Sequence, residues 1–100
     1  MRLPPHQIAT VLTLAREVMG EDASVTVFGS RLDEDRHGGD LDLLIETARR
    51  PTLLQRAELT LRLEEALAMP VDVIARARGA APTSFQALAI ARGIRLKSAQ

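Results

Sequence analysis

Three aspartates in this sequence occupy positions where apolar strands are expected. Asp40 and Asp42 alternate with leucines in DLDLLIE (40–46), and Asp72 lies between two valines in VDVIA (71–75). Because side chains alternate along a strand, Asp40 and Asp42 project from one face with Cα atoms roughly 6.6 Å apart. Two carboxylates at this spacing repel each other unless a cation lies between them. If the two strands are neighbours, the three carboxylates converge, and such hard oxygen ligands favour Mg²⁺ or Mn²⁺.

A glycine and a serine follow the apolar run SVTVF (24–28). A glycine directly after a strand lets the backbone turn sharply and approach a ligand closely, and a serine adds a hydroxyl and an N–H. Gly29 and Ser30 are therefore candidates for a turn that binds phosphate, and Arg31 adds a positive charge beside them. Taken alone, the Gly-Ser pair also fits a plain turn, and the Asp-x-Asp pair is equally unspecific.

Taken together, these residues resemble the nucleotidyltransferase superfamily related to DNA polymerase β. Those enzymes carry a glycine followed by Gly or Ser, a spacer, an Asp-hydrophobic-Asp/Glu pair on a strand, and a third carboxylate on a later strand. This chain has GS at 29–30, DLD at 40–42 and a lone Asp72 in VDVI. With the later AIARGIRL, the pattern is similar to the minimal nucleotidyltransferases, stand-alone catalytic domains of bacteria and archaea, over nearly the whole chain.

The resemblance implies a metal-dependent nucleotidyltransferase that transfers a nucleoside monophosphate, AMP from ATP, to a hydroxyl acceptor. The residues that would bind the nucleotide are Gly29, Ser30 and Arg31, and those that would bind Mg²⁺ or Mn²⁺ and act in catalysis are Asp40, Asp42 and Asp72. Asp72 would also orient or deprotonate the attacking hydroxyl.

The resemblance also implies a partner. Minimal members of the family are typically encoded beside a small helical protein of the HEPN or substrate-binding type, and several act as antitoxins that transfer AMP onto that toxin. An alternative remains open, in which the domain keeps the fold without catalysis and silences its partner by binding alone.

The composition is that of one small domain, which we place at residues 1–100. Hydrophobic residues make up 46% and charged residues 26% of the chain, as in ordinary globular proteins. No apolar run approaches the roughly 20 residues of a membrane span, and the start of the chain lacks the apolar middle of a signal peptide. We therefore expect a cytoplasmic protein. The absence of cysteine excludes disulfides and zinc–thiolate sites.

Charges balance overall but not along the chain. Between Glu21 and Asp42 seven acidic residues face two basic ones, and no acid follows Asp72. The basic residues after Asp72 are Arg76, Arg78, Arg92, Arg95 and Lys97. An acidic centre with a basic C-terminal end suits a site for cations and phosphates, or an acidic partner, although solvated helix surface gives the same pattern.

The aromatic residues argue against a nucleic-acid-binding module. The chain has no Trp or Tyr, and Phe28 and Phe85 lie in apolar runs typical of a core. Binding of single-stranded nucleic acid needs stacking aromatics and a broad basic face, so we do not expect direct nucleic-acid binding. For the same reason, recognition of the base and the acceptor is expected to come from elsewhere.

Helices and strands are expected to alternate. HQIATVLTLAREVMG (6–20) has apolar residues at helical spacing, and a second helix begins at Pro51 and Thr52 and ends at Met69-Pro70. The expected strands are 24–28, 40–46 and 71–75.

A last short helix in TSFQALAIARG (83–93) is capped by Thr83 or Ser84 and closed by Gly93. This order predicts an α/β (α+β) fold, a small mixed sheet with flanking helices, as in polymerase β-like nucleotidyltransferases.

Overall fold

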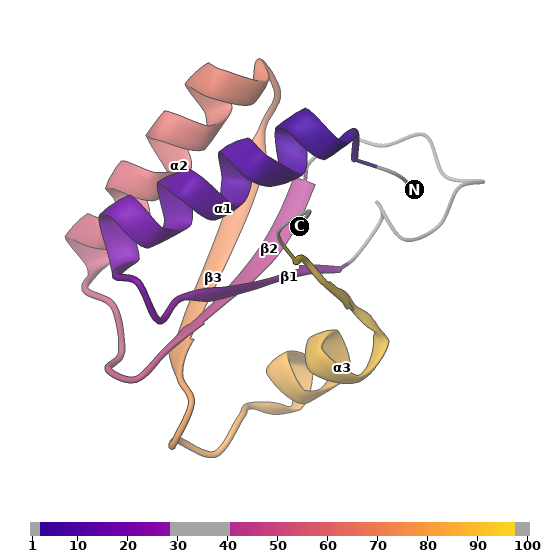
Figure 1. Ribbon diagram of the computed structural model, residues 1–100. Helices are drawn as coiled ribbons and strands as arrows, with labels where there is room; N and C mark the ends of the chain where they lie inside the picture. The colour runs from indigo at the N-terminus through magenta and orange to yellow at the C-terminus, as the bar shows by residue number, and fades with distance from the viewer. Residues whose placement is uncertain (1–2, 29–40, 98–100) are drawn as a thin grey trace.

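The computed structural model describes residues 3–28 and 41–97. Within these ranges the chain forms three helices and one four-stranded sheet (Figure 1). In chain order the elements are α1 (Pro5–Met19), β1 (Ser24–Phe28), β2 (Leu41–Thr47), α2 (Leu53–Leu67), β3 (Val71–Ala77), α3 (Ser84–Arg92) and β4 (Ile94–Arg95). Four predicted site residues lie outside the described residues: Gly29, Ser30, Arg31 and Asp40.

The sheet is mixed, as predicted. Its strands lie in the order β3-β2-β1-β4, with β2 and β3 parallel and the other neighbours antiparallel. A parallel pair needs a long crossover connection, and α2 supplies it. The three predicted strands are confirmed, and β3 continues beyond the predicted end at residue 75 to Ala77.

β4 is an element that the sequence analysis did not predict. Its two residues pair with Thr26 and Val27 at the edge of β1. Two residues are too few to show the alternation that indicates a strand. This short strand forms because the close approach of α3 to β1 brings the following residues against the free edge of β1.

Side-chain caps determine where α2 and α3 begin. The Thr52 hydroxyl accepts a hydrogen bond from the Gln55 N–H at 3.0 Å, and the Gln55 side chain accepts one from the Thr52 N–H at 2.8 Å. Thr83 and Gln86 form the same reciprocal pair at α3, so Thr83 rather than Ser84 is the cap.

No helix within the described ranges is long and apolar enough to span a bilayer.

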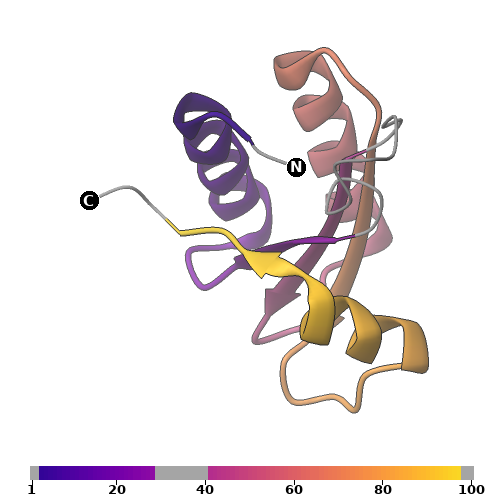
Figure 2. The ribbon, with the colours of Figure 1, turned by 90° about the vertical axis from the view of Figure 1, so that its right-hand side faces the viewer.

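The sheet has a different cover on each face. Figure 2 shows α1 and α2 on one side of the sheet and α3 on the other. Leu41, Leu43 and Ile45 of β2 point into the larger core with α1 and α2. The residues between them point to the opposite side, where Leu44 packs with Ala89 of α3 in a smaller cluster. We call this second side the α3 face.

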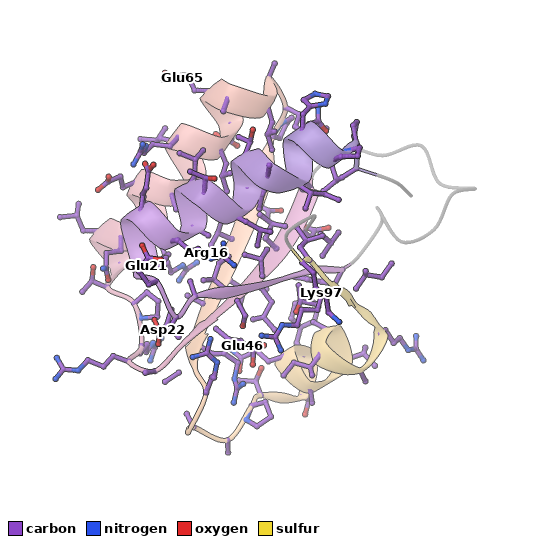
Figure 3. All side chains as sticks on the ribbon, viewed as in Figure 1. Arg16, Glu21, Asp22, Glu46, Glu65 and Lys97 are labelled. Atoms are coloured by element: carbon purple, nitrogen blue, oxygen red, sulfur yellow. The ribbon has the colours of Figure 1, made fainter. Side chains whose placement is uncertain are left out.

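Two of the basic residues after Asp72 form ion pairs with acidic residues, and the other three are exposed. This corrects the prediction of a single basic C-terminal end that no acid opposes. Arg76 is 8% exposed and its Nη1 lies 2.6 Å from Glu46 Oε2. Arg78 Nη1 lies 3.3 Å from Asp22 Oδ2, and Asp22 lies at the same end of the sheet as Glu46 (Figure 3). The exposed basic residues that remain are Arg92, Arg95 and Lys97.

Candidate active site

Three rows of paired residues cross β2 and β3 on the α3 face. The rows are Asp42 with Asp72, Leu44 with Ile74, and Glu46 with Arg76. The last row joins opposite charges in a buried ion pair, whereas the first places two carboxylates on adjacent strands, whose separation is about 4.8 Å. Like charges directly opposite one another destabilise a sheet. The first row, which we call the carboxylate pair, therefore places two like charges side by side near the start of both strands.

The carboxylate pair lies at the end of the α3 face that α3 does not cover. Leu44 and Ile74, one row away, pack in the cluster with α3, whereas Asp42 is half-buried and Asp72 is exposed. Asp42 and Asp72 thus project toward the same region of the surface, as the sequence predicted for neighbouring strands. The condition for convergence, that the two strands are neighbours, is confirmed and places Asp42 opposite Asp72, while Asp40 lies outside the described residues.

Backbone contacts fix the two strands at the point where they carry the carboxylates. The Leu41 N–H donates to the Pro70 carbonyl at 3.0 Å, which joins the start of β2 to the start of β3. The Val71 N–H donates to Glu64 Oε2 at 2.9 Å, which ties β3 to α2. Each bond lies one residue before an aspartate, so the backbone positions of Asp42 and Asp72 are set by neighbouring elements.

The end of β1 lies beside the carboxylate pair. Phe28, the last residue of β1, is the register partner of Asp42. Gly29 and Ser30 follow Phe28 in the chain and, like Arg31, lie outside the described residues. The end of β1 and the starts of β2 and β3 therefore meet at one edge of the fold.

The chemistry of the donors suits a hard divalent cation. Asp42 and Asp72 offer carboxylate oxygens, the ligands that Mg²⁺ and Mn²⁺ prefer. Among the described residues, which do not include Asp40, no group of three His, Cys, Asp or Glu side chains is placed to hold a metal. Two carboxylates leave coordination positions for water and phosphate, which is how Mg²⁺ commonly binds.

Phe85 differs from the prediction that both phenylalanines belong to the core. Phe28 is buried, but Phe85 in the first turn of α3 is 56% exposed. The two rings form an edge-to-face pair with centroids 5.6 Å apart. The core contact of α3 is instead made by Ala89, and periodicity alone could not show which apolar residues of so short a helix are buried.

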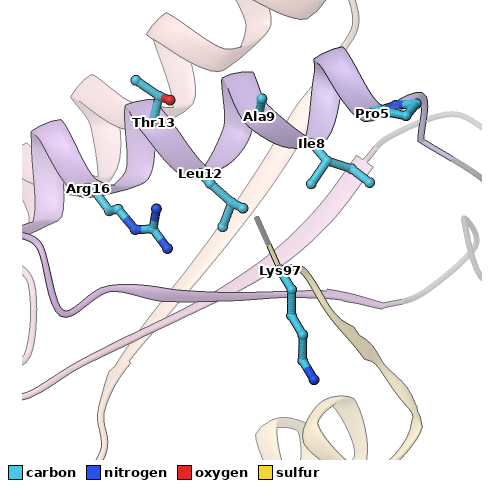
Figure 4. A pocket seen from close by; sticks show the side chains of 7 residues that line it. All are labelled: Pro5, Ile8, Ala9, Leu12, Thr13, Arg16 and Lys97. Atoms are coloured by element: carbon cyan, nitrogen blue, oxygen red, sulfur yellow. The ribbon is translucent and has the colours of Figure 1, made fainter. Parts of the chain in front are cut away.

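A separate groove of about 360 Å³ lies between α1 and the chain that follows β4 (Figure 4). Ile8 and Leu12 form part of its apolar wall, and Arg16 and Lys97 also line it. Its lining residues do not include Asp42 or Asp72. The groove is therefore distinct from the carboxylate pair.

Comparisons with known proteins agree with this arrangement. The family model for polymerase β nucleotidyltransferases matches residues 13–100. A solved structure of a protein assigned to the minimal nucleotidyltransferases is 35% identical, with a TM-score of 0.68, and the match covers 89% of this chain and 88% of that one. No curated protein matches this chain significantly.

Two more distant structures share the fold. One is a complex of a tri-AMPylated HEPN toxin from Shewanella oneidensis with its MNT antitoxin, at 21% identity and a TM-score of 0.71, covering 94% of this chain and 71% of that one. The other is a toxin-antitoxin with AMP-PNP, at 24% identity and a TM-score of 0.74, covering 98% and 76%. The family match over most of the chain establishes that this protein belongs to the polymerase β nucleotidyltransferases and is a minimal nucleotidyltransferase.

Proposed function

We propose that this protein transfers AMP from ATP to a hydroxyl group of a small helical HEPN-type partner, in a reaction that requires Mg²⁺ or Mn²⁺. The observation that carries the proposal is the carboxylate pair, two aspartates side by side on the α3 face beyond the cover of α3. The same two strands join opposite charges at Glu46 and Arg76, whereas the carboxylate pair brings two like charges together, an arrangement that a cation stabilises.

The reaction forms one bond and breaks another at the α-phosphorus. The oxygen of the acceptor hydroxyl attacks the α-phosphorus in line, and the bond to the oxygen that bridges to the β-phosphorus breaks, which releases pyrophosphate. Asp72 is exposed and accepts the hydroxyl proton or orients the hydroxyl. Gly29, Ser30 and Arg31 hold the phosphates in position.

Asp40, Asp42 and Asp72 are the residues that would hold the metal. When bound there, Mg²⁺ or Mn²⁺ supplies positive charge that offsets the charge developing on the phosphate oxygens. The contribution of the chain itself is to place carboxylates from two strands beside the end of a third.

The fold relatives support a protein acceptor. One is an MNT antitoxin in complex with a tri-AMPylated HEPN toxin, and another is a toxin-antitoxin structure with AMP-PNP. A carboxylate pair at the surface of a small domain is accessible to a macromolecule that presents its own hydroxyl.

The proposal is tested by mixing the protein with its HEPN-type partner, ATP and Mg²⁺ and measuring the intact mass of the partner. We expect the partner to gain whole AMP units. Asp72→Asn should slow this gain by about 100-fold or more, because it removes both the proton acceptor and a charge that holds the metal.

Glu65→Gln is the matched control, because it removes an exposed carboxylate of α2 on the other side of the sheet and should leave the rate unchanged. If the partner is bound and silenced with no added mass under any nucleotide, the protein is a binding module and the transferase proposal is wrong.

A further inference from the structure

Phe85 is an exposed aromatic side chain held in a defined position. More than half of its surface is open to solvent, yet its ring is in edge-to-face contact with the buried ring of Phe28. Edge-to-face contact between aromatic rings favours one relative orientation. An exposed ring that is held in this way can serve as a flat surface for another ring.

The backbone that carries Phe85 is fixed at both ends of α3. The reciprocal caps of Thr83 and Gln86 define its first turn. At its other end Gly93 approaches β1 so closely that an added Cβ would overlap Thr26 Cγ2 and lie 2.8 Å from the Val27 carbonyl oxygen. The position of Phe85 relative to β1 is therefore set before any ligand binds.

Phe85 is connected to the carboxylate pair by a short series of neighbours. Asp72 is the register partner of Asp42, Asp42 is the register partner of Phe28, and the Phe28 ring contacts the Phe85 ring. Residues directly opposite in a sheet project from the same face. Phe85 thus lies on the α3 face and contacts the residue that is directly opposite Asp42 in the sheet.

We propose that Phe85 is the platform on which the nucleobase of the substrate stacks, and that it favours purine over pyrimidine nucleoside triphosphates. The inference rests on the proposed function, because the phosphates must bind at the carboxylate pair for the base to reach the ring. Every base has a π-face, so adenine and guanine can both stack on a phenyl ring. The smaller pyrimidines offer less contact area and should bind more weakly. This assigns base recognition to the chain itself, where the sequence alone led us to expect it from elsewhere.

The absence of Trp and Tyr provides a direct test. Phe85→Trp introduces a single Trp into the chain, and its fluorescence should be quenched when ATP and Mg²⁺ are added. Leu61→Trp is the matched control, because Leu61 is 65% exposed on α2, which covers the opposite face. Its fluorescence should not change.

A second variant measures the contribution of the ring to affinity. Phe85→Leu keeps an apolar side chain, and calorimetry should show ATP binding weakened by about tenfold. CTP binding should weaken less, and Mn²⁺ binding without nucleotide should be unchanged. Thermal unfolding of each variant shows that it is folded.

Three outcomes would overturn the inference. If ATP with Mg²⁺ binds the wild type while the fluorescence of Phe85→Trp does not change and Phe85→Leu binds ATP normally, stacking is wrong and the proposed function stands. If Phe85→Leu binds ATP normally but no longer binds the partner, Phe85 is a protein contact. If the wild type binds neither ATP nor metal, the proposed function fails together with the inference.

Discussion

Gly93, which follows α3, lies tightly against β1. A Cβ at this position would overlap Thr26 Cγ2 and two backbone oxygens, and backbone atoms cannot move away independently. Gly93→Ala should therefore displace α3 from the sheet and lower the free energy of unfolding by about 1–3 kcal/mol, the usual cost of overpacking. Urea unfolding followed by circular dichroism measures this loss.

Gly79 provides the matched control for this prediction. A Cβ at Gly79 would have no atom within 4 Å, so Gly79→Ala should change the free energy of unfolding by less than about 0.5 kcal/mol. Equal effects of the two substitutions would show that the close approach at Gly93 does not hold α3 in place.

At the scale of elements, Asp22 joins the segment after α1 to the ends of β2 and β3. Its Oδ2 accepts a hydrogen bond from the Ala48 N–H at 2.7 Å and lies 3.3 Å from Arg78 Nη1. The hydrogen bond from Ala48, followed by the interaction with Arg78, holds the pKa of the Asp22 carboxyl below its ordinary value. The ionised form is thus preferred in the folded state.

A folded-state pKa below the unfolded value of about 3.9 gives a stabilisation that is present above that pH and is lost as pH falls toward the lower folded value. The wild type should therefore be more stable than Asp22→Asn at pH 6, by a modest amount because the pair is exposed, and this difference should shrink between about pH 5 and pH 3. Urea unfolding of both proteins across this range measures it.

Glu21→Gln is the control for the pH prediction. It removes a neighbouring carboxylate that is exposed. Its stability difference from the wild type should not follow the profile of Asp22→Asn. A difference between wild type and Asp22→Asn that is constant across the pH range would contradict the role of the Asp22 charge.

At the scale of the whole molecule, three strands from different parts of the chain meet beside two like charges. Repulsion between the two carboxylates should lower the free energy of unfolding of the metal-free protein, and a bound cation should offset this loss. We expect Mn²⁺ to raise the thermal unfolding temperature, because a ligand at 100 times its Kd stabilises by about 2.7 kcal/mol.

Asp72→Asn should abolish the thermal shift with Mn²⁺ while the metal-free variant is at least as stable as the wild type. Glu65→Gln should keep the shift. Equal shifts in wild type and Asp72→Asn would mean that the metal binds elsewhere and would remove the main support for the proposed reaction.

The sequence by itself determined the helices and three of the strands, and it supplied the candidate site residues, whose roles stay predictions. Apolar periodicity and end signals are local, so 24–28 and 71–75 could be identified as strands and Thr52 as a helix start. The alternation in DLDLLIE likewise predicted that the aspartates face the side opposite Leu41, Leu43 and Ile45, and the structure confirms this for Asp42.

Only the tertiary structure decided which residues face each other. The pairing of Asp42 with Asp72, the neutralisation of Arg76 by Glu46 and the addition of β4 depend on register between segments far apart in the chain. Register is set by packing of the whole core rather than by any local pattern. The exposure of Phe85 was decided in the same way, because the small Ala89 lets α3 approach the sheet and leaves the larger ring at its rim.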